Sequence, residues 1–163
     1  MIDVTTEFIH ACLTGDLDTL NNLLRRKEEI DVKQLDKCPL LKIAVRKGHL
    51  DIVRRLVRVG VNVNQTRPNS CSLGPLHLAC RFGNLPIVEL LVENGADIDA
   101  IDVVLKWTPL NIAVLMKKTS ITKLLLKNGC KINVRNHEGL TALEFALKKR
   151  YLDGVKQLAL HDE

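Results

Sequence analysis

A fivefold internal repeat constrains this chain more than any other feature of its sequence. The equivalent residues Gly15, Gly48, Gly83, Lys117 and Arg150 are separated by 33, 35, 34 and 33 residues. A period in this range is typical of stacked repeats, in which each unit buries its apolar face against its neighbours. Such a stack offers a long recognition surface and no deep catalytic pocket, so the repeat indicates a class of function as well as a fold.

The third copy shows most clearly how one repeat is expected to fold. Pro75 begins a helix, because a proline at the first helical position has no N–H that needs a partner. Gly83 ends this helix, and the apolar spacing from Leu85 to Val92 predicts a second one. Gly95 then ends the second helix in a left-handed conformation. Each repeat is therefore predicted to be a helix, a tight turn, a second helix and a projecting loop, and the fold class is all-α.

The composition fits thin helical layers in a reducing compartment. Apolar residues make up 46% of the 163 residues, enough for a sizeable core, whereas aromatic residues make up only 3%, which suits Leu, Ile, Val and Ala packing. The number of cysteines is odd and no CxxC pair occurs, so free thiols are expected. They are Cys12, Cys38, Cys71, Cys80 and Cys130. We expect the cytoplasm as the location, with the nucleus as a second one.

Several classes of chemistry are not expected. The net charge of +5 is spread over both halves of the chain, and aromatic stacking platforms are scarce, so nucleic-acid binding is not favoured. The sequence lacks the nucleotide-binding, serine-hydrolase and zinc-protease motifs. No apolar run approaches the ~18 residues that span a bilayer, and the N-terminus does not resemble a signal peptide. We therefore expect no enzymatic activity, cofactor, metal, small-molecule substrate or membrane insertion.

Two short motifs recur within the repeats. One reads Pro75-Leu76-His77-Leu78-Ala79 and Thr108-Pro109-Leu110-Asn111-Ile112-Ala113, and the other reads Gly95-Ala96-Asp97-Ile98-Asp99. With these motifs, nearly the whole chain resembles the ankyrin repeat family. The resemblance implies one solenoid domain, residues 1–163, and a protein–protein interaction module that acts as an intracellular adaptor or inhibitor. Its five repeats are expected at residues 1–33, 34–67, 68–102, 103–135 and 136–163, the first and last being caps.

The resemblance also implies where a partner binds. In this family, partners usually bind a concave face, formed by the projecting loops and by two positions near the end of each first helix. In this chain the rule predicts the partner-binding residues Arg46, Lys47, Arg81, Phe82, Leu105, Trp107, Leu115, Met116, Leu140, Lys148 and Lys149. The apolar members are expected to form one patch in repeats three to five, with the cations beside it. The expected partner is another protein, with apolar anchors and acidic flanks.

Alternatives stay open for individual side chains. Trp107 is either a partner anchor or a side chain that folds down over its own loop. His77 is expected to bond the backbone of the adjacent loop, and Asn64 to stabilise a turn. A second basic cluster on the second helices of repeats one and two is either a solvated face or a site for an acidic partner or nucleic acid. It consists of Arg25, Arg26, Arg54, Arg55 and Arg58.

The kind of interaction stays open as well. The alternatives are a direct inhibitor of an enzyme such as a cyclin-dependent kinase, an inhibitor or decoy for Rel-type transcription factors, and an ankyrin substrate-recruiting part of a ubiquitin ligase. Ankyrin inhibitors of cyclin-dependent kinases have a shortened first helix in their second repeat. The full-length segment from Pro39 to Lys47 therefore counts against that match. We expect a monomer, with self-association through the apolar patch as a further hypothesis.

Overall fold

The structure is a computed structural model that describes residues 4–25, 38–65 and 73–161. Over these residues the secondary structure consists of ten helices in five pairs, which confirms the all-α class. The first helices of the pairs are α1 (Val4–Thr14), α4 (Leu40–Lys47), α6 (Pro75–Phe82), α8 (Pro109–Leu115) and α10 (Ala142–Lys148). The second helices are α2 (Leu17–Arg25), α5 (Leu50–Arg58), α7 (Leu85–Glu93), α9 (Thr119–Lys127) and α11 (Leu152–Ala159).

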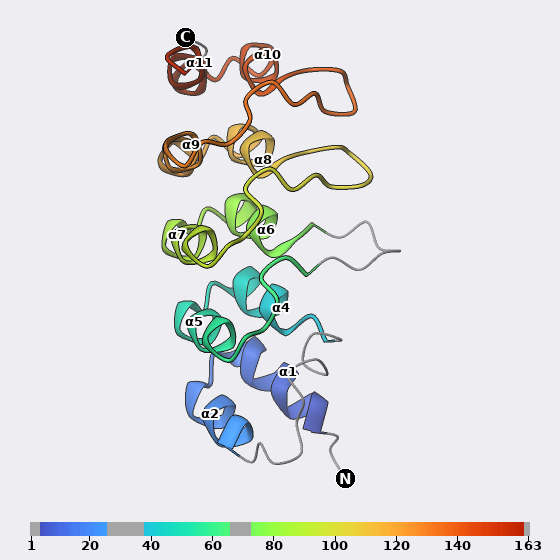
Figure 1. Cartoon of the computed structure of the whole chain (residues 1–163), viewed down its shortest axis with the longest axis vertical. Coiled ribbons are helices and arrows are strands. Elements are labelled where there is room, and N and C mark those ends of the chain that lie inside the picture. The colour runs from blue at the N-terminus through green and yellow to red at the C-terminus, as the bar shows by residue number, and fades with distance from the viewer. Residues whose placement is uncertain (1–3, 26–37, 66–72, 162–163) are drawn as a thin grey trace.

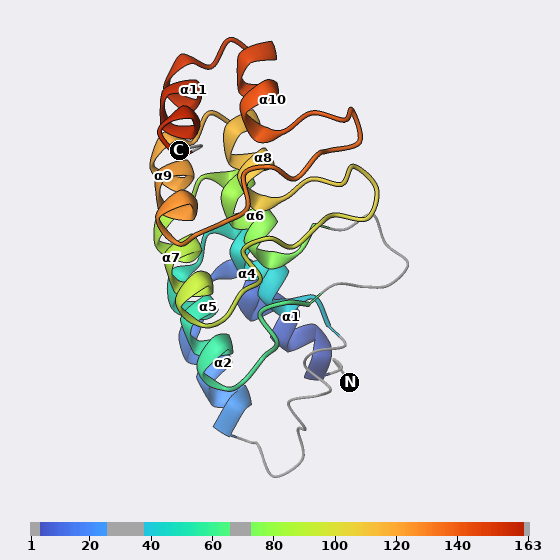
Figure 2. The same cartoon turned by 45° about the horizontal axis from the view of Figure 1, so that its top comes forward.

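The pairs stack into two parallel columns. Figure 1 shows the first helices in one column and the second helices in the other, with the loops between α7 and α8 and between α9 and α10 projecting beyond the first helices. The turned view in Figure 2 keeps the same order from α1 to α10 and shows these two loops on the same side. The molecule therefore has a loop side, beside the first helices, and an opposite side formed by the second helices.

Two rows of equivalent residues form the centre of this stack. The first row consists of alanines in the first helices, each 0% exposed: Ala11, Ala44, Ala79, Ala113 and Ala146. The second row consists of leucines in the second helices, each no more than 4% exposed: Leu23, Leu56, Leu91, Leu125 and Leu158. Small side chains let neighbouring helices approach closely, and each buried leucine contributes roughly 1.5–3 kcal/mol through removal of its side chain from water.

The helix boundaries follow from local chemistry, as the sequence predicts. Pro75 and Pro109 are the first residues of α6 and α8. The Thr108 side chain accepts a hydrogen bond from the Asn111 N–H, and the Asn111 side chain accepts one from the Thr108 N–H. Such a capping box satisfies backbone N–H groups that have no partner inside the helix. In the second repeat Pro39 precedes the helix, which begins at the equivalent position, Leu40, and runs to Lys47.

The turn between the two helices of a repeat requires a left-handed residue. Gly48 and Gly83 supply it, with φ of 80° and 77°. In the last two repeats Lys117 and Arg150 take the same conformation, with φ of 53° and 52°. A left-handed residue with a Cβ costs roughly 1–2 kcal/mol, so packing of the stack must impose this geometry on the lysine and the arginine.

The core of the fifth repeat differs from that of the inner repeats at one position. Second helices of the inner repeats bury an isoleucine, such as Ile87 or Ile121, at the position that Gly154 occupies in α11. The ring of Tyr151 lies in the space left free, and its hydroxyl is 2.7 Å from the hydroxyl oxygen of Thr119. A Cβ on Gly154 would lie 2.3 Å from a ring carbon of Tyr151, so the glycine is needed for the ring to sit there.

We expect Gly154→Ala to lower the free energy of unfolding. Alanine gains up to about 1 kcal/mol of helix propensity, but the clash with the buried ring costs about 1–3 kcal/mol. Urea denaturation followed by circular dichroism measures the net effect. In a Tyr151→Ala background the clash is absent, so the same change should be neutral or stabilising there. A loss of equal size in both backgrounds would contradict this explanation.

Candidate functional site

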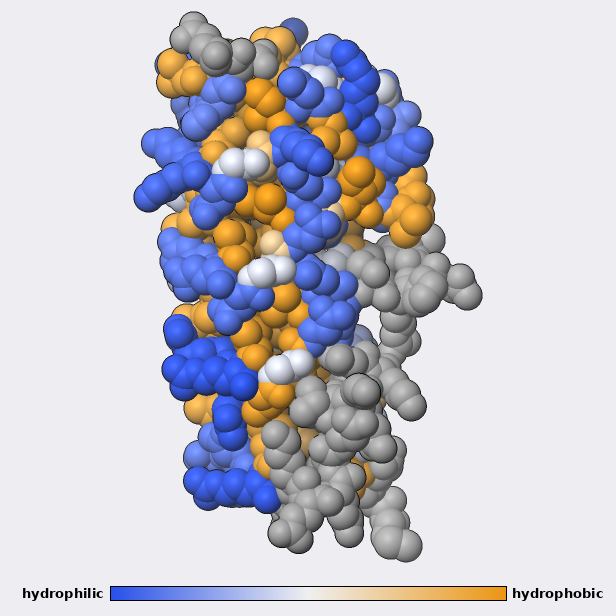
Figure 3. All heavy atoms as spheres, in the orientation of Figure 1, coloured by the Kyte–Doolittle hydropathy of each residue, from blue (hydrophilic) through white to orange (hydrophobic). Residues whose placement is uncertain are grey.

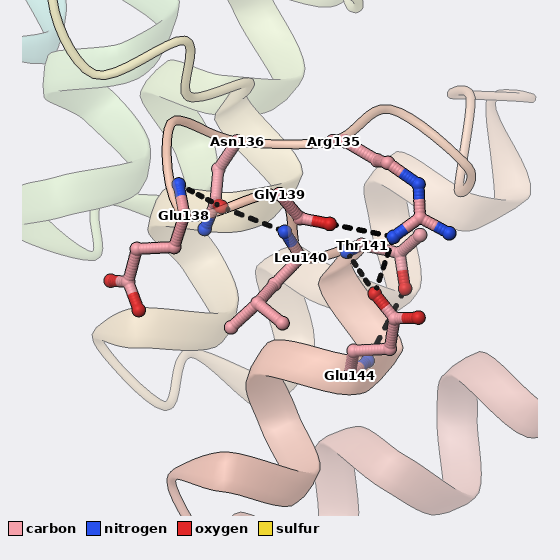
Figure 4. Close-up of polar contacts among 7 residues, drawn as sticks. All are labelled: Arg135, Asn136, Glu138, Gly139, Leu140, Thr141 and Glu144. Carbon is pink, nitrogen blue, oxygen red and sulfur yellow. Dashed lines mark hydrogen bonds and ion pairs between the residues drawn. The ribbon is translucent and has the colours of Figure 1, made fainter.

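Polar side chains shape the hairpins that project on the loop side. The buried carboxylate of Asp102 accepts hydrogen bonds from the N–H groups of Leu105, at 2.7 Å, and Val104, at 3.4 Å. In the next hairpin the side-chain oxygen of Asn136 accepts from the N–H groups of Glu138 and Leu140, as Figure 4 shows. Because these bonds are local, each hairpin keeps a defined loop without regular sheet pairing.

Figure 4 also shows how the second of these hairpins joins α10. The guanidinium of Arg135 donates to the Gly139 carbonyl and lies 3.0 Å from the Glu144 carboxylate. The same carboxylate accepts from the Thr141 N–H, which lowers the pKa of Glu144. These contacts fix the path of the chain into the fifth repeat.

Each hairpin is also bonded to a neighbouring repeat. A ring nitrogen of His77 lies 3.0 Å from the Trp107 carbonyl, which confirms the backbone bond predicted for this histidine. The N–H of His137 donates to the Leu105 carbonyl at 3.0 Å. The Asn64 side chain donates to the Gly95 carbonyl and accepts from the Asp97 N–H, so it stabilises a turn as expected. The hairpin around Trp107 is thus held from both sides.

Trp107 packs against the next repeat, and its role as a partner anchor stays a prediction. Its ring centroid lies 5.8 Å from that of Phe145 and 6.3 Å from that of His137, so the half-buried indole packs on the fifth repeat. The same side chain also lines a groove on the loop side. The indole therefore contributes both to packing between repeats and to the wall of a groove.

This α6/α8 groove has a volume of about 360 Å³ and an apolar lining. Four of the residues predicted for the patch line it: Leu105, Trp107, Leu115 and Met116. The Leu105 and Met116 side chains are 39% and 36% exposed. Figure 3 shows hydrophobic residues gathered at the projecting hairpin beside α8. Such a recess with large apolar walls suits the side chain of another molecule.

A second recess, the α4/α6 groove, lies directly beside the first. It has a volume of about 400 Å³ and is lined by Ile43, Arg46, Leu78 and Phe82, among others. Leu73 and Arg81 line both grooves. Exposed Phe82 therefore belongs to the α4/α6 groove, and the single patch that the sequence predicts is divided between two recesses.

The other predicted site residues line neither groove. Leu140 is half-buried and packs against the core. The Lys148 ammonium forms an ion pair with Glu138, and that of Lys149 lies 5.4 Å from the centre of the Phe145 ring. Lys47 is exposed at the end of α4. The cations that lie at the grooves are thus on the α4 and α6 side.

Sequence reasoning missed several groove residues that a simple spacing rule reveals. Ile112 precedes Leu115 and Met116 by three and four residues, so it shares their helix face. Leu78 stands in the same relation to Arg81 and Phe82 in α6. Asp102 was missed as well, because its role in the hairpin depends on loop geometry.

The basic cluster lies on the opposite side of the molecule. A groove of about 340 Å³ between α2 and α5 is lined by Asp51, Arg54, Arg55 and Arg58, together with two residues of α2. The Nε–H of Arg55 donates to the Asn21 side-chain oxygen at 2.7 Å. Arg25 is exposed at the end of α2, and Arg26 lies outside the described residues.

No potential metal centre and no membrane-spanning helix occurs in the described part of the chain. Within residues 4–25, 38–65 and 73–161, no three His, Cys, Asp or Glu side chains are grouped so that they could hold a metal ion. No helix in those ranges is long and apolar enough to cross a membrane. The thiols of Cys12 and Cys130 are buried, which raises the pKa of each to about 12, and Cys80 is buried too. Cys38 is a partly exposed free thiol, and Cys71 lies outside the described residues.

Comparison with known proteins agrees with this architecture. The profile described as ankyrin repeats (3 copies) matches residues 8–102 and 100–163. The chain belongs to the ankyrin repeat family. Ankyrin repeats are protein-interaction modules, and the family is typically non-enzymatic.

The relatives of this ankyrin repeat chain are diverse and longer. It is 34% identical to an ankyrin repeat protein of fowlpox virus over 126 residues, which are 77% of this chain and 37% of the relative. It is 32% identical to the ankyrin repeat protein nuc-2 of Neurospora crassa over 96% of this chain and 14% of the relative. It is 35% identical to the mouse ankyrin repeat and SOCS box protein 11 over 73% of this chain and 35% of the relative. The chain thus spans well under half of these relatives.

Truncation of Trp107 should test its packing role. We expect Trp107→Ala to lower the free energy of unfolding by about 2–3 kcal/mol, because contacts with Phe145 and His137 are lost. Leu105→Ala, in the same groove wall, should cost under about 1 kcal/mol because its side chain is substantially exposed. Urea denaturation followed by far-ultraviolet circular dichroism compares the two. Equal costs would contradict a structural role for the indole.

His77 should make stability depend on pH. Burial lowers the pKa of His77 below its ordinary value of 6.5. Below pH 6.5 the unfolded chain therefore binds a proton more readily than the folded chain, and the free energy of unfolding falls as the pH is lowered. His77→Asn, which copies Asn111 of the next repeat, should be less stable at pH 7.5 but should lose less stability between pH 7.5 and 5.5. The free energy of unfolding of both proteins is measured by urea denaturation across this pH range. Equal losses in the two proteins would contradict the role assigned to His77.

Proposed function

We propose that this ankyrin repeat chain captures a segment of a partner protein on its loop side and acts as an intracellular adaptor or inhibitor. The observation that carries the proposal is the apolar α6/α8 groove, which holds large exposed side chains between rigid helices and a bonded hairpin. Interface centres are typically rich in aromatic and Met side chains and in arginine. Arg81 supplies the arginine at the edge of the groove.

The residues that line the α6/α8 groove favour binding of a partner over catalysis. Most lining residues come from α6, α8 and the bonded hairpin between α7 and α8, and Leu73 comes from the segment that leads into α6. Walls built from helices and a bonded hairpin are preformed, and a preformed site loses little conformational freedom when a partner binds. Asp102 is the acidic group in the lining, and its carboxylate is occupied by backbone N–H groups. A partner that is held by side-chain burial fits this surface better than a substrate that needs an acid or a base.

Recruitment of a substrate to a ubiquitin ligase is the second candidate. It is supported by the similarity to a mouse protein that contains ankyrin repeats and a SOCS box. Both candidates use the same groove, and they differ in what else the captured partner contacts.

Affinity capture from a lysate of the native source tests the proposal. The tagged wild-type chain is compared with Leu105→Glu/Met116→Glu, which places charge in the α6/α8 groove. The matched control is Leu152→Glu/Leu160→Glu, because these leucines are 71% and 78% exposed on the fifth repeat. Melting curves first establish that all three proteins are folded.

We expect quantitative mass spectrometry to show at least one partner that is reduced roughly tenfold by the groove variant, a loss of about 1.4 kcal/mol, and is retained by the control. Ubiquitin-ligase subunits among the captured proteins would favour the recruiting role. Identical partners for all three proteins would refute the groove as the binding site.

A further inference from the structure

The two loop-side grooves are neighbours along the stack. They share Leu73 and Arg81, so these two side chains border both the α4/α6 groove and the α6/α8 groove. Each groove lies beside a pair of adjacent first helices. A chain that follows the stack would therefore place one of its side chains in each groove.

The grooves differ in charge. Arg46 and Arg81 line the α4/α6 groove and are exposed. The ion pairs found among the described residues are Arg135–Glu144 and Lys148–Glu138, so the two arginines are not engaged by a carboxylate from the described part of the chain. Planar guanidinium groups bind carboxylates in a bidentate manner. This groove is therefore suited to an acidic side chain.

The α6/α8 groove selects against the same group. Its walls are Leu105, Leu115, Met116 and the indole of Trp107, and its acidic member, Asp102, is buried and bonded to its own loop. Arg81, which borders both grooves, is the one cation among the described residues of this lining, whereas Lys42 and Arg46 stand beside it in the lining of the α4/α6 groove. A carboxylate among the apolar walls would lose water and could meet a cation only at that shared boundary, which is less favourable. An apolar side chain gains by burial instead.

We infer that the two grooves are unlike subsites of one track, which binds an extended protein segment carrying an Asp or Glu three residues from a Leu, Met or Phe, in either chain direction. This inference rests on the proposed function and adds the order and spacing of the recognised residues. Adjacent packed helices are roughly 10 Å apart. An extended chain of the polyproline II type rises about 3.1 Å per residue and repeats its face every three residues, so side chains three apart match that distance. A helical segment would need about seven residues for the same span.

Selection from a display library of random 12-residue peptides tests the inference even while the natural partner is unidentified. Selections run in parallel on the wild type, on Leu105→Glu/Met116→Glu and on Arg46→Glu/Arg81→Glu. The matched control is Arg54→Glu/Arg58→Glu, which makes the same charge change on the second-helix side. We expect an acidic residue three positions from an apolar one in the wild-type and control selections. The Arg46→Glu/Arg81→Glu protein should select Lys or Arg at that position.

The selected consensus, as a synthetic capped peptide, then allows a direct measurement. Trp107 is the single tryptophan of the chain and lines the α6/α8 groove, so its fluorescence reports occupancy of that groove by a tryptophan-free peptide. Replacement of the acidic residue by Lys should weaken binding to the wild type roughly tenfold, as expected for the loss of two exposed ion pairs. The Lys peptide should regain affinity for Arg46→Glu/Arg81→Glu.

The possible failures are distinguishable. Peptides that depend on Leu105 and Met116 but carry no acidic residue at this spacing, or carry it seven residues away, would overturn the two-subsite inference and leave the proposed function standing. Peptides unaffected by the groove variant, or no enrichment over an empty support, would count against both. Equal loss of binding in the control variant would show that overall charge, and not the α4/α6 groove, determines the preference.

Discussion

The close contact between successive first helices is the interaction on which the rest of this structure depends. One fully buried alanine per repeat lets each helix approach the next, and the leucine row closes the core behind it. A single helix pair cannot bury such a face alone, so every repeat owes its stability to its neighbours. The same contact fixes which helix face points to the loop side. The positions three and four residues beyond a buried residue, such as Leu115 and Met116 after Ile112, then line the groove.

The stack also imposes one backbone path on different residue types. Gly83 makes the turn between its helices with little strain, whereas Lys117 and Arg150 must adopt the left-handed conformation at a cost. In the fifth repeat Gly154 and the ring of Tyr151 replace the isoleucine found in the inner repeats. Local preference is thus overridden where the neighbouring repeat determines the geometry, and the space of the isoleucine is filled by a different side chain.

The difference between local preference and contacts from a neighbouring repeat explains what the sequence could predict. Helix ends at Pro75 and Thr108 follow from local chemistry, and the period places the alanine and leucine rows, so the fold could be predicted almost completely. The site could be predicted only in part, because loop side chains take their directions from contacts with another repeat. The spacing of residues in the sequence predicts neither the ion pair of Lys148 with Glu138 nor the boundary that Leu73 and Arg81 form between the two grooves. The sequence therefore predicted one patch where the structure has two recesses.

The hairpin around Trp107 links the stability of the stack to the rigidity of the α6/α8 groove. His77 in α6 bonds the Trp107 carbonyl, and His137 of the following hairpin bonds the Leu105 carbonyl, so repeats on both sides hold this loop. The indole packs on Phe145 while it lines the α6/α8 groove. A wall held in this way does not need to be ordered when a partner binds, and less of the binding free energy is lost to conformational entropy. Changes in the fifth repeat that loosen Phe145 should therefore weaken a groove to which that repeat contributes no wall residue.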